Sequence, residues 1–264
     1  SGFIPKDKFD TSHFNKDSIT VKPDIYFYLF DGYTGNTALK EFWNFDNHEY
    51  KDSLIRIGFQ VADSAQGNYP ATIAALSSMF NFSMFQNPQL FNYNMDLTIQ
   101  KHIKNNQLFT ILKHNGYAVH TNSFLFDKKP FYFSQSDVNP RSFFFANTIT
   151  RHLLYRMVLK LIDKIIENPY DWISWYYEYD KRVEVSLDKQ INPTQNQPTF
   201  FYNHLMLTHT IYRYDSAGKH LISNTSEPSK QNYIDQIKYN NLISLKYFSA
   251  LVDSYTKQNK PLVI

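Results

Sequence analysis

The 264-residue sequence contains no cysteine, and this absence removes several kinds of chemistry. Disulfides, thiolate metal sites, a cysteine nucleophile and any cofactor formed by oxidising a cysteine are all excluded. The absence does not by itself indicate a cellular compartment.

Long hydrophobic runs and runs of like charge are also missing. No segment reaches the ~18 consecutive apolar residues of a membrane span, and no charged-then-apolar signal peptide opens the chain. The net charge is only +3, and no lysine or arginine run would follow a phosphate backbone. Hydrophobic residues make up 42% of the sequence, which is enough for a sizeable core. We expect a soluble piece of protein with no nucleic-acid partner.

The stretch 22–33 carries the clearest structural signal. It is an apolar and aromatic run without helical periodicity, opened by Pro23 and closed by Asp31 and Gly32, which is typical of a buried parallel strand. In open α/β sheets the ligand crevice lies outside the carboxyl ends of the strands, so Asp31 is well placed for chemistry. The alternative is that Asp31 only caps a helix that begins near Thr34.

The rest of the chain alternates helix and strand patterns. We expect helices at 37–42, 47–57, 105–114, 142–166 and 233–257, and further strands at 59–62, 117–122, 198–209 and 262–264. This order predicts an α/β fold in which a mostly parallel sheet is flanked by helices on both faces. The inward stripe of the last helix is predicted to be Ile234, Ile237, Asn241, Leu245, Phe248 and Val252.

A polar, glycine-containing loop runs through Pro70 into a helix of small residues. Because proline is favoured at the first helical position, the helix start is predicted at about Asn68–Pro70. The free amides and positive dipole end of such a helix form an anion site, and Asn68 and Thr72 would stand beside it. The alternative gives Asn68 the role of a helix cap and nothing more.

Two histidines lie on the predicted strand 198–209. His209 ends that strand and so matches the position of Asp31, whereas His204 lies in mid-strand and is predicted to be a core histidine with satisfied ring nitrogens. Residues 124–195 are predicted to be an aromatic-rich helical insertion over the edge of the crevice. Their aromatic side chains either shape a pocket for sugar or lipid or form ordinary core.

Three motifs together resemble the alkaline phosphatase superfamily: Pro23-Asp24-Ile25-Tyr26-Phe27 to Asp31-Gly32, Asn68-Tyr69-x-x-Thr72, and Thr208-His209-Thr210-Ile211-Tyr212. The pattern is similar to the sulfatase-like and phosphoglycerol or phosphoethanolamine transferase branch, whose bacterial members are often membrane-anchored with the catalytic domain outside. The resemblance spans residues 22–264. It implies an extracytoplasmic location, periplasmic or at the cell surface, with anchoring membrane segments upstream. It also implies a linker or tag remnant at 1–22 and an incomplete catalytic domain at 23–264.

The resemblance further implies one divalent metal, which is zinc, manganese, magnesium or calcium. Asp31 would bind this ion together with Asn68 and Thr72, and further ligands are expected beyond Ile264. His209 matches a histidine that contacts the substrate's phosphate or sulfate, although Ile211 replaces the usual proline. The nucleophile slot falls at Asn68, whose amide is a poor nucleophile. Either the nearby hydroxyl of Thr72 attacks, or another group attacks, or catalysis has been lost.

Three functions follow from this resemblance. The first is metal-dependent hydrolysis or transfer of phosphate esters, including phosphodiesters, of envelope lipids or glycans, with a small-molecule, lipid or glycan ester as the substrate. The second is a sulfatase-like sulfuric ester hydrolase, which is less favoured because the cysteine and arginine of the oxidised-residue motif are absent. The third is an inactive binding domain of the same fold. A shared metal requires Asp31 and the helix start to bring side-chain oxygens roughly 3–5 Å apart.

Overall fold

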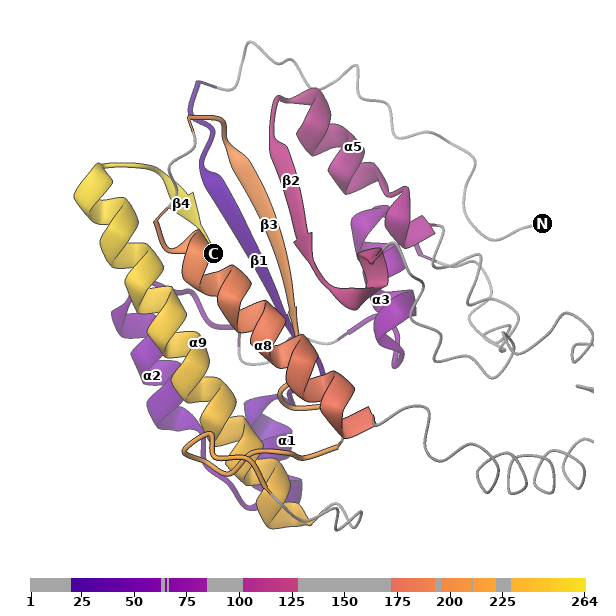
Figure 1. The fold of residues 1–264 in the computed structure, drawn as a ribbon, viewed down its shortest axis with the longest axis vertical. Coiled ribbons are helices and arrows are strands. Elements are labelled where there is room, and N and C mark those ends of the chain that lie inside the picture. The colour runs from indigo at the N-terminus through magenta and orange to yellow at the C-terminus, as the bar shows by residue number, and fades with distance from the viewer. Residues whose placement is uncertain are drawn as a thin grey trace, which may run out of the picture.

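The computed structural model describes residues 20–62, 65, 67–84, 102–127, 172–192, 196–209, 211–221 and 229–264. Within these residues the chain forms one four-stranded sheet in which every strand pair is parallel. The strands are β1 (Asp24–Phe30), β2 (Ala118–Asn122), β3 (Thr199–Leu205) and β4 (Leu262–Val263), in the spatial order β2-β3-β1-β4. The predicted α/β fold with a parallel sheet is confirmed (Figure 1).

The helices of the described residues are α1 (Asn36–Trp43), α2 (His48–Arg56), α3 (Thr72–Phe80), α5 (Gln107–His114), α8 (Trp172–Gln190) and α9 (Lys230–Gln258), with a short 3₁₀ turn η5 (Phe124–Phe126). Figure 1 shows α3 and α5 on one side of the sheet and α8 and α9 on the other. The helices predicted at 37–42, 47–57, 105–114 and 233–257 correspond to α1, α2, α5 and α9. The helix predicted at 142–166 lies outside the described residues.

After Asp24, every residue of β1 is apolar or aromatic, because alternate side chains enter two different cores. Ile25, Phe27 and Leu29 pack against the core under α3 and α5. Tyr26 and Tyr28 point the other way, into the core formed with α8 and α9. A strand covered on both faces needs no polar side, which explains the continuous apolar run.

Two local predictions were wrong. Residues 59–62 form no strand, and the ring of Phe59 instead packs against Phe248 of α9 with ring centroids 5.0 Å apart. The buried face of α9 is also rotated from the predicted stripe, since only Ile237 and Phe248 of that stripe are fully buried. The remaining buried positions of α9 are Tyr233, Gln236, Asn240, Ser244, Tyr247, Leu251 and Tyr255. Several of these are polar, so a search for apolar residues misplaces the face.

The aromatic segment before β3 contributes α8, which packs directly on the sheet. Tyr176 and Tyr179 are buried in the core with Leu205 and Tyr247. For these two tyrosines the ordinary-core alternative is therefore correct. No helix in the described ranges combines the length and apolar character needed to cross a membrane.

Candidate functional site

Asp31 lies at the carboxyl end of β1, as predicted, and the end of β3 holds its backbone in place. Its N–H donates to the Leu205 carbonyl at 2.9 Å, and the Thr208 hydroxyl donates to the Asp31 carbonyl at 2.7 Å. Gly32 has a φ of +77°, and a Cβ atom there would lie 2.8 Å from the carbonyl oxygen of Thr208. Only glycine permits both this backbone conformation and this close approach of the two strand ends. The turn therefore fixes the position of the Asp31 backbone, from which the carboxylate side chain extends.

Thr72 contacts this carboxylate from helix α3, of which it is the first residue. Its hydroxyl donates a hydrogen bond to Asp31 Oδ1 at 3.0 Å across 41 residues of sequence. The predicted spacing of roughly 3–5 Å between Asp31 and a helix-start oxygen is thus met by Thr72. The Asp31 side chain is 14% exposed, so the pair lies near the surface without being fully open to solvent.

The predicted helix start was wrong by a few residues, and this moves Asn68 away from the helix. The residue before α3 is Ala71, which has an extended backbone and makes no side-chain cap. Because the extended residue Ala71 separates Pro70 from α3, the proline belongs to the loop that precedes this helix. Asn68 is exposed in the same loop and precedes the first turn of α3. The first-turn amides of α3 are consequently left without a capping side chain.

His204 is completely buried on β3 and touches the same carboxylate. Its Nε2 atom lies 3.2 Å from Asp31 Oδ2, and its Nδ1 atom lies 3.1 Å from the hydroxyl of Ser123. The prediction of a core histidine with satisfied ring nitrogens is confirmed. What the sequence did not reveal is that one of those partners is Asp31. His204 therefore orients the carboxylate while Thr72 occupies its other oxygen.

These contacts set the charge of Asp31. Burial raises the pKa of this carboxyl. The hydrogen bond and charge of His204, the charge of His209 and the hydrogen bond from Thr72 all lower the pKa. Together they outweigh the effect of burial, so the net pKa lies below its ordinary value. Asp31 is therefore ionised at neutral pH. A fixed, ionised carboxylate next to a hydroxyl can accept a proton from it or hold a cation beside it.

His209 is partly exposed and lies four residues beyond the end of β3, so the prediction that it ends this strand was wrong. Its N–H donates to the Met206 carbonyl at 3.1 Å in a turn. β3 belongs to the same sheet as β1, as predicted, and the charge of His209 acts on Asp31. The ring Nδ1 atom lies 3.3 Å from the hydroxyl of Tyr176, a buried residue on α8. Burial raises the pKa of this phenol, which keeps it protonated. The phenol can donate to Nδ1 when that atom carries no proton, so the direction of this hydrogen bond depends on the tautomer of the ring.

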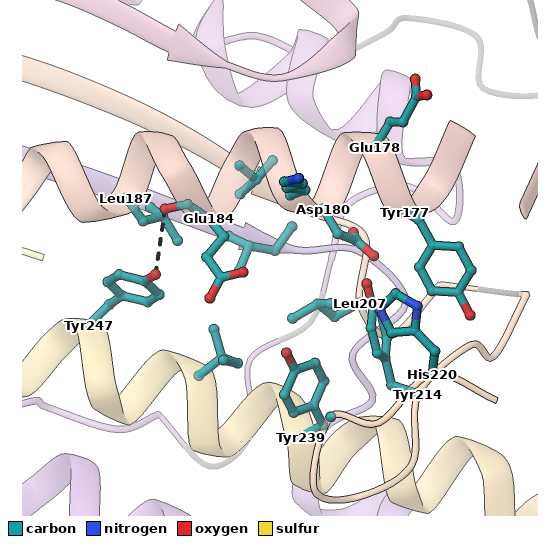
Figure 2. Close-up of a pocket in the computed structure, with 15 residues that line it drawn as sticks. Tyr177, Glu178, Asp180, Glu184, Leu187, Leu207, Tyr214, His220, Tyr239 and Tyr247 are labelled. Carbon is teal, nitrogen blue, oxygen red and sulfur yellow. Dashed lines mark hydrogen bonds between the residues drawn. The ribbon is translucent and has the colours of Figure 1, made fainter. Parts of the chain in front are cut away.

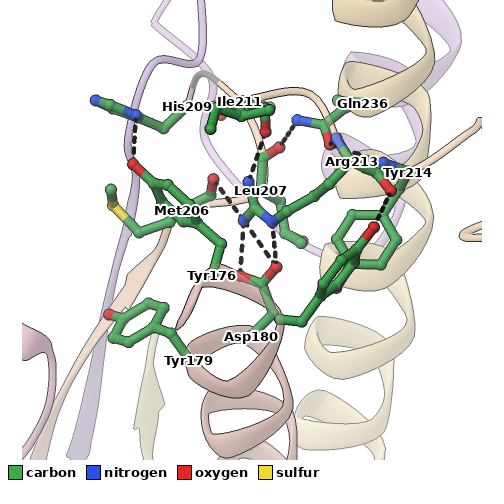
Figure 3. A network of polar contacts seen from close by, with 12 residues as sticks. Tyr176, Tyr179, Asp180, Met206, Leu207, His209, Ile211, Arg213, Tyr214 and Gln236 are labelled. Carbon is green, nitrogen blue, oxygen red and sulfur yellow. Dashed lines mark hydrogen bonds and ion pairs between the residues drawn. The ribbon is translucent and has the colours of Figure 1, made fainter. Parts of the chain in front are cut away.

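The buried ion pair between Arg213 and Asp180 packs against Tyr176 (Figure 3). The guanidinium of Arg213 lies 4.6 Å from the centre of the Tyr176 ring. It also binds Asp180 through two hydrogen bonds, Nε to Oδ2 at 2.7 Å and Nη2 to Oδ1 at 2.9 Å. A third contact runs from Nη2 to the carbonyl of Met206, in the segment between β3 and His209. This network ties α8 to the loop that carries His209.

The cluster offers part of a metal site. The Asp31 carboxylate and the Thr72 hydroxyl are hard oxygen donors, which suit magnesium, manganese, calcium or zinc. In the described ranges, however, no group of three or more histidine, cysteine, aspartate or glutamate side chains is arranged to hold a metal. These residues fit two positions of a coordination shell, and a complete shell needs donors from elsewhere in the chain, from water or from substrate.

The structure thus brings Asp31, Thr72 and His209 to one edge of the sheet and leaves Asn68 in the adjoining loop. Sequence reasoning missed three contributors: His204, Ser123 and Tyr176. The sequence predicted a mostly parallel sheet but not which strands pair within it, so nothing in it pointed from His204 to Asp31. In the observed register Leu29 pairs with His204, which sets this histidine next to the residue that ends β1.

The fold and the cluster define an α/β protein with a carboxylate, hydroxyl and histidine site at the carboxyl ends of parallel strands. Comparisons with protein-family models, curated proteins and solved structures found no match for the chain.

Proposed function

We propose that this chain carries out metal-dependent transfer or hydrolysis of phosphate esters, with Thr72 as the nucleophile and Asp31 as its base and metal ligand. The observation that supports this most directly is the 3.0 Å hydrogen bond from the Thr72 hydroxyl to Asp31. A hydroxyl is activated as a nucleophile when a basic group lies within hydrogen-bond reach. The choice of phosphate esters of envelope lipids or glycans, outside the cytoplasm, rests on the family resemblance alone.

The position of Thr72 at the start of α3 supports an anionic substrate. The first-turn amides of a helix point outward and carry partial positive charge. The residue before the helix, Ala71, supplies no capping side chain to these donors. His209 acts on the Asp31 carboxylate through its charge, and its imidazole can donate to an anion bound beside that carboxylate.

The chemistry then follows from the residues present. The Thr72 Oγ attacks phosphorus, its proton moves to Asp31, and the bond between phosphorus and the leaving alcohol oxygen breaks. The proton held by Asp31 passes to that alcohol, and water or an acceptor alcohol later takes the phosphoryl group from Thr72. His204 keeps Asp31 in place by binding its second oxygen. A divalent metal bound there would supply Lewis acidity that lowers the pKa of the hydroxyl.

The decisive experiment measures turnover of an aryl phosphodiester, an aryl phosphate monoester and an aryl sulfate, each with zinc, manganese, magnesium or calcium. The expected result is metal-dependent phosphoester turnover and a covalent phosphate on Thr72, detected by mass spectrometry. Thr72→Ala abolishes both, and Asp31→Asn lowers turnover roughly 10²–10⁴-fold. Thr256→Ala, an exposed threonine on α9, is the matched control and leaves turnover unchanged.

The same experiment separates the alternatives. Faster turnover of the aryl sulfate than of either phosphate ester would identify a sulfuric ester hydrolase. Anion binding without turnover under any metal, with no covalent phosphate, would identify a binding domain that keeps the fold. Full activity in Thr72→Ala would contradict the assignment of the nucleophile.

A further inference from the structure

A cavity of about 470 Å³ lies between α8 and α9, apart from the cluster around Asp31. Its volume is within the range of small-molecule sites, which is roughly 300–1,000 Å³. Leu205 and Leu207 line it from the end of β3, and Val183, Leu187 and Ile243 line it from the two helices. Asp31 and Thr72 meet at α3, so the cavity does not depend on the proposed catalytic site.

Aromatic rings form much of the cavity wall. The ring planes of Tyr177 and Tyr214 lie at 89° to each other, and their centroids are 5.5 Å apart. The ring centroid of Tyr239 lies 5.0 Å from that of Tyr214. Figure 2 shows Tyr239 pointing from α9 toward α8 and Tyr214 approaching from the segment after β3. Burial raises the pKa of all three phenols, so they stay uncharged at neutral pH. The faces of such rings carry partial negative charge.

The turn that contains Gly218 packs directly on the ring of Tyr239. A Cβ atom at Gly218 would overlap that ring, and the glycine has a φ of +83°, which other residues rarely adopt. Glycine at this position therefore allows the close contact between the turn and this part of the cavity wall.

One carboxylate is placed to act on a ligand in the cavity. Glu178, Asp180 and Glu184 are the acidic lining residues and Lys181 also lines the cavity, but Figure 2 shows the Glu178 side chain pointing away from it. Asp180 is already neutralised by its two hydrogen bonds with Arg213. Among the residues that the structure describes, Glu184 forms no ion pair, and Figure 2 shows its side chain reaching from α8 toward Tyr239.

We infer that this cavity binds a small organic cation, with an ammonium group held between the ring of Tyr239 and the Glu184 carboxylate and its carbon substituents against Leu205 and Leu207. The ring of Tyr177 is already stacked on His220, and the Arg213 guanidinium already lies over the ring of Tyr214. Electron-rich ring faces attract ammonium groups, most strongly where water is excluded. The Glu184 carboxylate adds a Coulombic attraction to the ammonium group that does not depend on the shape of the ligand. Neutral ligands of the same shape would keep the apolar contacts and lose both of these attractions.

The test compares two probes on the whole chain by calorimetry: choline, and 3,3-dimethyl-1-butanol, which has the same shape without the charge. The expected result is saturable binding of choline at least roughly tenfold tighter than that of the neutral alcohol. Choline binding should also weaken as salt is raised. Equal affinity for the two probes, or no saturable choline binding, overturns the inference.

Paired variants assign the binding to this cavity. Tyr239→Phe keeps the ring face and should retain choline affinity within about twofold, whereas Tyr239→Leu should lose roughly tenfold. Glu184→Gln should weaken binding about three- to tenfold, while Glu49→Gln on the exposed face of α2 leaves it unchanged. Circular dichroism checks that each variant is folded. Unchanged affinity in a folded Tyr239→Leu variant, or equal losses in the two glutamate variants, overturns the assignment.

Discussion

His204 and Asp31 are 173 residues apart in the sequence, yet Nε2 of the histidine lies 3.2 Å from Oδ2 of the aspartate. The histidine side chain is fully buried and that of the aspartate is 14% exposed. The contact exists because β1 and β3 are parallel neighbours whose register pairs Leu29 with His204. It gives the carboxylate a fixed orientation and lowers its pKa.

The first prediction concerns acid stability. Because the pKa of Asp31 in the folded chain is lower than the ordinary value of 3.8, the folded state binds fewer protons than the unfolded state in this range. Asp31 therefore stabilises the fold fully above pH 3.8, and this contribution is lost as the pH falls through the lower, folded-state pKa. Urea unfolding as a function of pH should show a flatter acid limb in Asp31→Asn. Asp253→Asn, an exposed site on α9, is the control, and an identical flattening there would contradict the argument.

The second prediction concerns Gly32. An alanine at this position would adopt a positive φ and press its Cβ against the carbonyl of Thr208, so Gly32→Ala should cost about 1–3 kcal/mol of unfolding free energy. Gly67→Ala is the matched control, because its nearest atom would be an ordinary 3.8 Å away. Its effect should stay within about 0.5 kcal/mol. Chemical denaturation measures both, and equal stability of the two variants would contradict the strain argument.

The third prediction concerns the buried ion pair. Arg213→Met leaves Asp180 buried without its partner and should destabilise the chain by about 3–5 kcal/mol. Burial already raises the pKa of Asp180 despite the arginine, so part of the loss should be recovered at acid pH, where the carboxyl is protonated. Arg182→Met removes a half-exposed pair with Asp127 and should cost under about 1 kcal/mol. Similar losses in the two variants would show that the Arg213 pair is not desolvated.

The fourth prediction concerns Tyr176 and applies if phosphoester turnover is observed. Tyr176→Phe keeps the ring over Arg213 but removes the hydroxyl from His209 Nδ1. Loss of this orienting hydrogen bond should lower kcat roughly tenfold with little change in KM. The nitrogen chemical shifts of His209 should move toward the other ring tautomer. Unchanged shifts and unchanged kcat would assign Tyr176 to packing alone.

The sequence by itself indicated where the four strands of the sheet and most helices lie, but not their exact ends. Apolar and aromatic residues dominate 24–30 and 199–205, and such segments are satisfied only when both faces of a strand are covered, so their place in a parallel sheet is readable from local composition. Gly116, which follows α5, has the positive φ expected of a residue that ends a helix. The strand predicted at 59–62 failed because Phe59 finds its apolar partner on α9, and composition does not say where such a partner lies.

The tertiary structure decided the site. Asp31 and Thr72 could be singled out along the chain, but the start of α3 depends on how its loop reaches the sheet, and this placed Thr72 on the carboxylate and left Asn68 outside. His204 and Ser123 joined the cluster through the strand order and register, and Tyr176 joined it through the packing of α8 on the sheet. Contacts between residues so far apart carry no local periodicity, because they arise from packing between elements rather than from the preferences of any one of them.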